Sequence, residues 1–445
     1  MESLIDRAQA AGVTLTRVTY CDNANLIRAK AVPVPGLAGA AQHGIGFSVA
    51  QQALPMMYDT VLPATGLTPA GETWLVPDPA TFTPLPYSPG SAMVLGDFMT
   101  ADGRPWAHCP RACLKRAVAQ AAADGLEVRA VFEPEFYLLR PATRGGFEPV
   151  DQTNFAMTAA LDQSHAVVID LAHALDAMGL DLQMIHPEAG PGQFEVSIRH
   201  AEAVSAADRH ILLREAVRGV AIRHGLAVSF AAKPFPEKVG SGNHLHLSVW
   251  KNGRNLLFDR DDPLHLSPEG YQWIAGLLAH IHGLCALTIP SVNSYQRLRP
   301  HYWAGAYACY GSDNREAAVR VITPRRGPES MNVELKTVDG SANPYLALAG
   351  AIAAGLDGLR KGLDPGAPVE SDPGLLSDDE RARGRILPVP RRLIDAVEAL
   401  ERDPLLLQTL GPELAQSFTA VRRGEWDALK DLPPDAQALQ HLLKY

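Results

Sequence analysis

The pattern of apolar and polar positions divides the chain near Pro110. Before this residue, short extended runs broken by Pro and Gly clusters predict a small, mostly β region with strands at residues 14–20, 27–32, 73–76 and 92–98. After it, helical periodicity is interspersed with strand-like runs. Predicted helices cover residues 110–125, 165–178, 205–225 and 268–287 and most of the last fifty residues, and predicted strands cover 126–139, 226–233 and 244–250. Helices and strands mix without strict alternation, which predicts an α+β fold.

Two boundary signals support these helices. Ser205 and Asp208 have the spacing of a capping box for the helix that ends near Gly225. Asn343 followed by Pro344 predicts the start of another helix, because Asn is a good N-cap residue and Pro fits the first helical position.

The segment Val131–Arg140 holds two glutamates within an otherwise apolar strand pattern. Glu133 and Glu135 are two residues apart, so on a strand their carboxylates point to the same face and repel each other. A hard divalent cation such as Mg²⁺ offsets that repulsion and prefers oxygen ligands. The alternative is the solvated polar face of an edge strand, and this segment alone does not decide between the two.

Composition and charge narrow the classes of protein. The chain has 445 residues, of which 47% are hydrophobic and 20% charged, as in a globular protein of two or three domains. Its formal net charge of −9 and the lack of a basic run argue against nucleic-acid binding. We expect no membrane segment and a cytoplasmic location, because no long apolar run and no signal peptide are present. Five cysteines without metal-type spacing predict free thiols.

Two further segments contain candidate metal ligands. Glu188 and Glu195 flank a Gly-Pro-Gly turn in HPEAGPGQFEV, so both carboxylates can approach one point, although surface acids on a plain hairpin are an alternative. His244 and His246 share one face of a strand directly after a glycine-containing loop, in GSGNHLHLS. A histidine pair placed in this way favours a ligand site over a structural role.

The C-terminal half adds cationic residues and one more carboxylate. Arg315 and Arg320 lie in NREAAVRV, and arginine is the preferred bidentate partner of phosphate, although two surface arginines are the alternative. Glu334 lies in NVELKTVDG. Five glutamates and one histidine form an oxygen-dominated set suited to two or more Mg²⁺ or Mn²⁺ ions. Together with the arginines, this set predicts a metal-dependent phosphoryl-transfer enzyme, without naming the acceptor.

The motifs in their order resemble those of the glutamine synthetase family of the bacterial class I type. The matching segments are FEPEFYL, HPEAGPGQFE, KPF with GSGNHLHLS, NSYQRLRP, NREAAVRV and ELKTVDGSANPYLALAG. DNANLIRAKAVP and VPDPATFTPLP near the N-terminus, and LGPELAQSFTAVRRGEWDAL near the C-terminus, extend the likeness over nearly the whole chain.

The resemblance implies a domain organisation and an assembly. A small β-grasp-like domain at residues 1–102 would precede a larger catalytic domain at 103–445, with a curved, mainly antiparallel sheet flanked by helices. Family members form rings, usually dodecamers of two hexamers, with each active site between subunits. They make γ-glutamyl phosphate from glutamate and ATP, and an amine nitrogen then attacks the activated carbonyl. Two to three Mg²⁺ or Mn²⁺ ions would serve each site.

The resemblance also implies roles for individual residues. One ion would be held by Glu135, Glu188 and Glu195, and another by Glu133, His244 and Glu334. By the same resemblance, ATP would be contacted by His246, Ser248 and Arg320. The transferred phosphate would be bound by Arg315 and Arg320. Glutamate would be bound by Gly240, Arg297, Arg315 and Lys336. Arg315, Arg320 and Glu334 would be the catalytic set.

Three positions depart from the family pattern. Trp303 stands where glutamine synthetases carry the glutamate that binds ammonium, and Ser48 stands where the neighbouring subunit supplies an aspartate. Lys336 replaces the arginine that grips the carboxylate of the substrate. An aromatic wall suits an alkyl, aryl or substituted ammonium group through cation–π contact. The sequence therefore predicts a ligase that joins glutamate to a primary amine, such as an alkylamine, ethanolamine or a polyamine.

Three alternatives stay open at this point. Trp303 could be a core residue in an authentic glutamine synthetase that uses ammonia. The chain could be a non-catalytic scaffold, although all six presumptive metal ligands are present. A guanidine-forming kinase of the same fold is the third, and the intact motif order argues against it.

Overall fold

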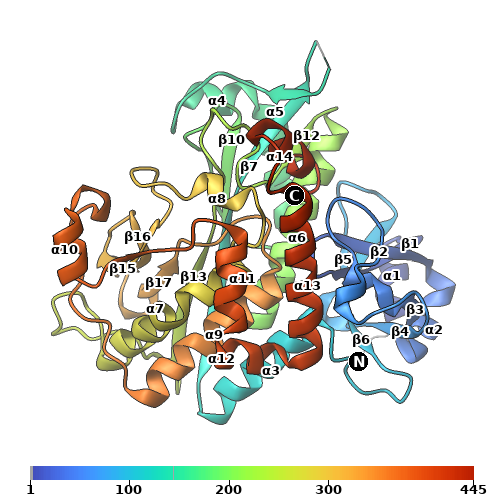
Figure 1. The fold of residues 1–445 in the computed structure, drawn as a ribbon. Coiled ribbons are helices and arrows are strands. Elements are labelled where there is room, and N and C mark those ends of the chain that lie inside the picture. The colour runs from blue at the N-terminus through green and yellow to red at the C-terminus, as the bar shows by residue number, and fades with distance from the viewer. Residues whose placement is uncertain (1–3, 144) are drawn as a thin grey trace.

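The N-terminal part of the chain forms a mixed sheet. The structure is a computed structural model that describes residues 4–143 and 145–445. Six strands pair in the order β2-β1-β6-β4-β3, with β5 beside β6, and the pairing of β1 with β6 is parallel. This sheet is the blue body in Figure 1. The strands of this sheet are β1 (Leu15–Cys21), β2 (Ile27–Pro33), β3 (Ile45–Ser48), β4 (Glu72–Pro77), β5 (Thr83–Pro84) and β6 (Ser91–Met99), and the same part of the chain contains the helices α1 (Leu4–Ala10) and α2 (Leu37–His43).

A second, larger sheet carries the residues of interest. Its main path is β18-β15-β16-β17-β13-β7-β10-β9, and all of these pairings are antiparallel except that of β15 with β16. The strands are β7 (Glu127–Pro141), β8 (Phe147–Pro149), β9 (Leu182–Pro187), β10 (Gln193–Ile198), β11 (Ala201–Glu202), β12 (Ala227–Ser229), β13 (Asn243–Lys251), β14 (Arg254–Asn255), β15 (Tyr307–Ser312), β16 (Ala317–Ile322), β17 (Asn332–Leu335) and β18 (Leu387–Pro388). The α+β prediction is confirmed.

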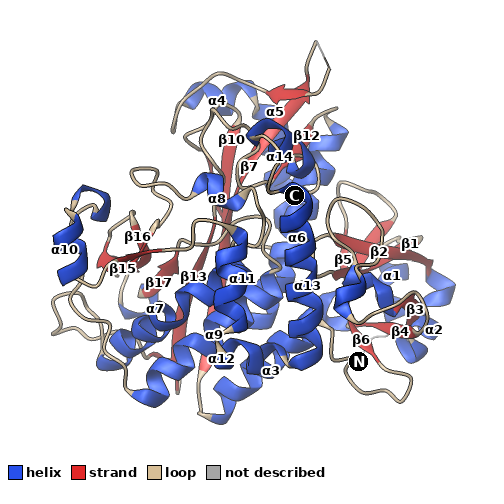
Figure 2. Ribbon diagram, viewed as in Figure 1, coloured by secondary structure: helices blue, strands red, loops and turns tan. Residues whose placement is uncertain are grey.

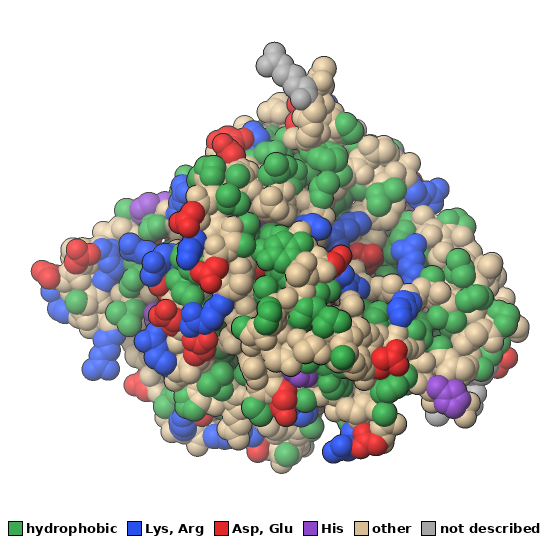
Figure 3. All heavy atoms as spheres, turned by 45° about the vertical axis from the view of Figure 1, so that its right-hand side comes forward, with side chains coloured by type: hydrophobic (Ala, Val, Ile, Leu, Met, Phe, Trp, Pro, Cys, Tyr) green, Lys and Arg blue, Asp and Glu red, His purple; other side chains and the backbone are tan. Residues whose placement is uncertain are grey.

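Helices flank this sheet, as Figure 2 shows. They are α3 (Pro110–Ala123), α4 (Thr158–Gln163), α5 (His165–Ala177), α6 (Ala203–Arg223), α7 (Pro268–Thr288), α8 (Ser294–Arg297), α9 (Pro344–Lys361), α10 (Asp378–Arg383), α11 (Leu393–Glu401), α12 (Pro404–Leu410), α13 (Pro412–Leu429) and α14 (Pro434–His441). Within the described residues, none of these helices combines the length and apolarity that a membrane crossing needs. On the face drawn in Figure 3, acidic and basic side chains are intermixed.

The predicted helix starts differ in their outcome. The side chain of Asn343 accepts hydrogen bonds from the amides of the first turn of α9, as expected. The capping box at Ser205 is wrong, because α6 begins at Ala203 with Glu202 as its N-cap residue. Asp208 instead accepts hydrogen bonds from Arg111 of α3 and Tyr345 of α9, so this carboxylate joins three helices. The strand predicted at 226–233 is shorter and corresponds to β12.

The core helices α7 and α9 pack closely through glycines. A Cβ atom at Gly276 would lie 2.1 Å from the carbonyl oxygen of Ala354, and one at Gly358 would lie 2.0 Å from that of Gln272. Both distances are far below van der Waals contact, so glycine is required for this approach of the two backbones. The five cysteines are free and buried, as the sequence predicts.

Candidate active site

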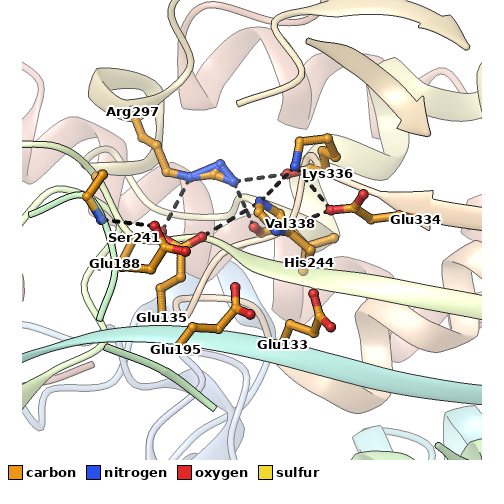
Figure 4. A network of polar contacts seen from close by, with 12 residues as sticks. Glu133, Glu135, Glu188, Glu195, Ser241, His244, Arg297, Glu334, Lys336 and Val338 are labelled. Atoms are coloured by element: carbon orange, nitrogen blue, oxygen red, sulfur yellow. Dashed lines mark hydrogen bonds and ion pairs between the residues drawn. The ribbon is translucent and has the colours of Figure 1, made fainter. Parts of the chain in front are cut away.

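The register of the large sheet aligns the candidate residues in a row. Glu195 on β10 lies opposite Glu135 on β7, and Glu133 on β7 lies opposite His244 on β13. Because residues two apart on a strand share a face, the carboxylates of Glu133 and Glu135 join this row on one side of the sheet. Figure 4 shows the carboxylates of Glu133, Glu135 and Glu195 pointing to the same side, toward His244.

The same register continues into the next two strands. His246 on β13 lies opposite Glu334 on β17, and Glu334 lies opposite Arg320 on β16. The row therefore crosses five neighbouring strands, from the carboxylate of Glu195 on β10 to the guanidinium of Arg320 on β16. Sequence spacing predicts which residues share a face within a strand, whereas strand order and register bring the separate motifs together.

A cavity of about 740 Å³ lies over this row. All five glutamates and both histidines of the predicted site line it, together with Gly240, Arg297, Arg315, Arg320 and Lys336. Its apolar side is formed by Phe155, Met184, Tyr302, Trp303, Val239, Ala304 and Ile322. One side of the cavity is thus strongly charged, and another is aromatic and aliphatic.

Two of the carboxylates have strongly raised pKa values. Burial and the neighbouring charges of Glu133 and Glu135 raise the pKa of Glu195 to about 10. Burial and the charge of Glu188 raise the pKa of Glu135 to about 7. Both shifts have the same physical cause: several carboxylates are removed from water and lie near one another. A positive charge placed among them would relieve the repulsion.

Two other carboxylates already have cationic partners. Burial opposes ionisation of Glu334, but the charge of Lys336, whose Nζ atom is 3.0 Å from Glu334 Oε1, outweighs it and holds the pKa of Glu334 well below the usual range. Burial likewise opposes ionisation of Glu133, and the charge and hydrogen bond of His246 lower its pKa. The uncompensated negative charge therefore lies at the β10 end of the row.

The donor set fits a divalent metal ion. Ligand atoms of Glu133, Glu195 and His244 lie within 4.8 Å of one another, and so do those of His186, Glu188 and Glu195. Carboxylate-rich sets of this kind suit Mg²⁺ or Mn²⁺. Glu195 belongs to both groups. His186 was not predicted, although it lies two residues before Glu188 in the same motif.

The two remaining predicted ligands lie close to these groups. Glu334 Oε1 is 3.3 Å from His244 Nδ1, and Glu135 Oε1 is 4.0 Å from His244 Nε2. The imidazole of His244 therefore lies between Glu135 and Glu334, with one ring nitrogen facing each carboxylate. Burial, followed by the charge of Lys336, lowers the pKa of His244 well below its usual value, so the ring is neutral and able to coordinate a metal.

The two residues predicted to contact ATP have different surroundings. His246 Nε2 is 3.0 Å from Glu133 Oε2, and its Nδ1 is 2.8 Å from Asn332 Oδ1. Burial opposes protonation of this ring, but Glu133 outweighs it and raises the pKa of His246 to about 9. Ser248 is not among the residues that line the main cavity, and its hydroxyl accepts a hydrogen bond from Trp250 Nε1 at 2.9 Å.

The two predicted phosphate-binding arginines mark an opening of the cavity. Arg315 and Arg320 also line an adjoining cleft of about 520 Å³, whose other basic residues are Arg325 and Arg326. Arg320 is anchored by an ion pair with Glu334 at 3.2 Å, whereas Arg315 is exposed. This opening is therefore suited to an anion with several charges.

Two residues predicted to bind glutamate, Arg297 and Gly240, are held by hydrogen bonds to neighbouring polar groups. Together with Gln193 they form what we call the polar frame of the cavity. Arg297 Nη2 donates hydrogen bonds to the carbonyl oxygens of Lys336 and Val338. The carbonyl of Gly240 accepts from Gln193 Nε2, which also contacts Glu135 Oε2 at 3.1 Å. Gln193 was not predicted, since a single amide in a turn gives no distinctive sequence signal.

Lys336 points into the charged part of the site. Its Nζ atom is 3.0 Å from Glu334 Oε1 and 3.5 Å from His244 Nε2, and the side chain is buried. The ammonium therefore neutralises a carboxylate in the row and also faces the cavity.

Trp303 lies at the mouth of the cavity, and its side chain is 53% exposed. Its ring meets that of Phe155 edge to face, with centroids 6.4 Å apart. Phe155 in turn contacts the ring of His186. The interpretation of Trp303 as a core residue does not agree with this exposure. Phe155 was not singled out in the sequence, because it lies in a long loop far from the motifs.

Ser48 lies apart from this cavity in a single chain. Its hydroxyl accepts a hydrogen bond from the amide of Ala50 at the end of β3, and Ser48 is not among the residues that line the cavity. Its assignment was made for the site of a neighbouring subunit, so it stays a prediction.

Comparison with known proteins identifies the family. A model of the glutamine synthetase catalytic domain matches residues 107–440, and a model of the glutamine synthetase N-terminal domain matches residues 2–106. The chain belongs to the glutamine synthetase family. Family membership and the row of carboxylates make it an ATP-dependent γ-glutamyl ligase. Members of the glutamine synthetase family generally use Mg²⁺ or Mn²⁺ together with ATP.

Relatives within the family include both amine ligases and glutamine synthetases. The gamma-glutamylpolyamine synthetase GlnA3 of Streptomyces coelicolor is 38% identical, with 99% of this chain and 97% of the relative covered. The glutamine synthetase of Halobacterium salinarum is 32% identical over 100% of this chain and 96% of its own. A solved structure described as "GmaS/ADP complex-Conformation 1" matches with a TM-score of 0.86 and 33% identity, covering 97% of each chain.

Proposed function

We propose that this protein joins glutamate to a primary amine. ATP would phosphorylate the γ-carboxylate of glutamate, and the amine nitrogen would then displace phosphate to give a γ-glutamylamide, ADP and phosphate. The observation that carries the proposal is the aromatic wall of Trp303 and Phe155 beside the charged row, at the mouth of a cavity of about 740 Å³. An alkylamine, ethanolamine or a polyamine is the proposed class of nucleophile.

The carboxylate row would hold two to three metal ions. We assign Glu135, Glu188 and Glu195 to one ion and Glu133, His244 and Glu334 to another, with His186 as an additional candidate ligand. A bound ion would neutralise charge on the phosphoryl group as it is transferred. The fit rests on the carboxylates themselves, because burial and the charges of neighbouring glutamates raise the pKa values of Glu195 and Glu135.

The arginines would bind the phosphoryl group. Arg320 is held by Glu334 at 3.2 Å, so its guanidinium is pre-positioned at the edge of the row. Arg315 is exposed at the opening and free to follow the phosphate. His246 and Ser248 are assigned to the nucleotide, with His246 kept charged by Glu133 and thus suited to a phosphate oxygen.

Glutamate would lie between the row and the polar frame. The assigned contacts are the backbone of Gly240 and the side chains of Arg297 and Lys336. The guanidinium of Arg297 is fixed by two backbone carbonyls, and the ammonium of Lys336 is fixed by Glu334. Lys336 offers a point charge to the carboxylate of the substrate, where an arginine would offer a planar fork.

The amine side distinguishes this proposal from ammonia use. Binding ammonium requires negative charge, and Trp303 presents an aromatic surface at that position instead. The relative named a gamma-glutamylpolyamine synthetase supports an organic amine. An authentic glutamine synthetase is the second candidate, since several relatives at 31–36% identity carry that name.

The proposal extends to the assembly. Following the family, we assign residues 1–102 to an N-terminal domain and 103–445 to a catalytic domain, within a dodecamer whose sites lie between subunits. Ser48 would then reach the amine pocket of a neighbouring subunit.

Phosphate release from ATP, Mg²⁺ and glutamate across a panel of amines tests the proposal. The panel contains ammonium, methylamine, ethanolamine, putrescine, spermidine and aniline. We expect turnover with at least one organic amine and little with ammonium. Fastest turnover with ammonium would refute the amine assignment. ATP binding without turnover for any amine would favour a scaffold role.

A substitution in the wall sharpens this test. Trp303→Ala should raise KM for the organic amine by about fivefold, since a cation–π contact contributes on the order of 1 kcal/mol. KM for ATP should stay unchanged. Leu439→Ala is a matched control, because Leu439 is a large exposed apolar residue outside the cavity lining.

A further inference from the structure

The loop that carries Trp303 has an unusual backbone. Two of its residues other than glycine have positive φ angles, +67° at His301 and +55° at Trp303. This left-handed region is disfavoured for residues with a Cβ atom, and a bulky aromatic residue is a rare occupant. Such a conformation persists only where the surrounding structure holds it. The 300–304 loop therefore needs an anchor.

Secondary structure does not supply that anchor. In the part of the chain that the structure describes, no backbone carbonyl accepts a hydrogen bond from the amides of residues 301–304. Two of these amides donate instead to one carboxylate. The amide of Trp303 donates to Glu316 Oε1 at 2.7 Å, and the amide of His301 donates to Glu316 Oε2 at 3.2 Å.

Glu316 is itself well fixed. The residue is 6% exposed, and its own amide donates to Asn314 Oδ1 at 3.0 Å. Asn314 also donates to the carbonyls of Val369 and Ser371. Glu316 directly follows Arg315, whose side chain lines the cavity. Two consecutive residues thus have separate roles: Arg315 is a proposed phosphate ligand, and Glu316 anchors the loop that carries Trp303 of the aromatic wall.

A second contact holds the other side of the loop. His301 Nδ1 is 2.7 Å from Asp372 Oδ2. This pair is more open than the Glu316 contacts, because the His301 side chain is 52% exposed. Glu316 is therefore the buried anchor, and Asp372 is a peripheral one.

We propose that Glu316 is a positioning residue that holds the 300–304 loop in its strained conformation and thereby sets the amine specificity of the site. Its two carboxylate oxygens hold the backbone on either side of Tyr302, so the indole of Trp303 stays at the mouth of the cavity beside Phe155. The statement about specificity rests on the proposed function, whereas the statement about the loop does not.

Glu316→Gln tests both parts. The amide group keeps the size of the side chain but offers one acceptor oxygen, so its NH₂ group would face one of the two backbone amides. We expect KM for the organic amine to rise about tenfold, the cost of losing a charge-assisted hydrogen bond, with KM for ATP within about twofold of wild type. The ratio of organic-amine to ammonium turnover should fall. Equal changes in KM for all three substrates, or none, would overturn the specificity role.

A readout without catalysis separates this inference from the proposed function. Trp303 is the one of the six tryptophans with an exposed side chain, so iodide should quench its fluorescence. Subtracting the signal of Trp303→Phe isolates this contribution. Glu316→Gln should change the quenching constant of Trp303 even if no amine proves to be a substrate. An unchanged constant in a folded variant would overturn the anchoring role.

A matched control excludes a general loss of structure. Glu425 is likewise a buried carboxylate that accepts a hydrogen bond from the backbone of a distant segment, at the amide of Met56. Glu425→Gln should leave the amine selectivity and the Trp303 quenching unchanged. Asp372→Asn should produce the same changes as Glu316→Gln to a smaller extent, because its partner is exposed. Identical behaviour of the Glu425 and Glu316 variants would refute a specific role for Glu316.

Discussion

Metal binding at the carboxylate row should release about one proton. In the metal-free protein the pKa of Glu195 is about 10 and that of Glu135 is about 7. At pH 7.5 the first group is almost fully protonated and the second roughly one quarter protonated, by the ordinary titration relation. A divalent ion coordinates the ionised carboxylates, so both groups must lose these protons when it binds. The expected release is therefore between about 1 and 1.3 protons per site.

Isothermal titration calorimetry with Mn²⁺ in buffers of different ionisation enthalpy measures this number directly. The slope of the observed enthalpy against the buffer enthalpy gives the protons released. The same reasoning predicts that the association constant increases about tenfold per pH unit between pH 7 and pH 9.

Two variants make the assay decisive. Glu195→Gln removes the group with the largest pKa shift, so its proton release should fall to about 0.3 or less. Glu148→Gln is the matched control, because Glu148 is exposed and pairs with Arg140 away from the cavity. Release near zero in the wild-type protein, or unchanged release in the Glu195 variant, would refute the electrostatic reasoning.

Three other predictions follow from named contacts. The pKa values of Glu195 and His246 are raised in the folded state, so their protonated forms stabilise the fold at low pH. This contribution is lost as the pH rises toward about 9 to 10. Tm of the metal-free protein should therefore fall between about pH 6 and pH 9 and recover on addition of Mn²⁺. Glu135→Ala should abolish ATP turnover with an unchanged circular dichroism spectrum, and near-wild-type activity would contradict its assignment as a ligand. Gly276→Ala should lower the free energy of unfolding by about 1–3 kcal/mol, because its Cβ would lie 2.1 Å from a backbone carbonyl of α9. Gly39→Ala should be neutral or stabilising, because a Cβ atom there would have no atom within 4 Å. Denaturant titration compares the two variants.

The chemistry of the site could be predicted from the sequence. Glu133 and Glu135 share a strand face because their spacing equals the strand period, and the same holds for His244 and His246. The helix that begins at Pro344 could be predicted because the Asn343 side chain is a good N-cap. These features depend on residues close together in the chain, so their physical causes are visible in the sequence.

The failed prediction at Ser205 has the opposite cause. Ser205 and Asp208 fit a capping box locally, yet the carboxylate of Asp208 binds Arg111, almost a hundred residues away. A buried arginine requires a buried partner more strongly than a helix end requires one particular cap. Contacts across the fold therefore override a local pattern.

The proposed amine side of the site depends on tertiary structure. The sequence motifs show that Trp303 occupies the position where the family usually has a glutamate. Its exposure and its contact with Phe155, however, depend on two loops that are far apart in the chain. The role of Glu316 is also invisible in the sequence, because its carboxylate binds backbone amides, and any residue other than proline supplies such an amide. The sequence by itself determined the family, the metal ligands expected within each strand and the missing ammonium-binding glutamate. Register, burial and the anchoring of one strained loop decided how those residues meet, since they depend on packing between segments distant in the chain.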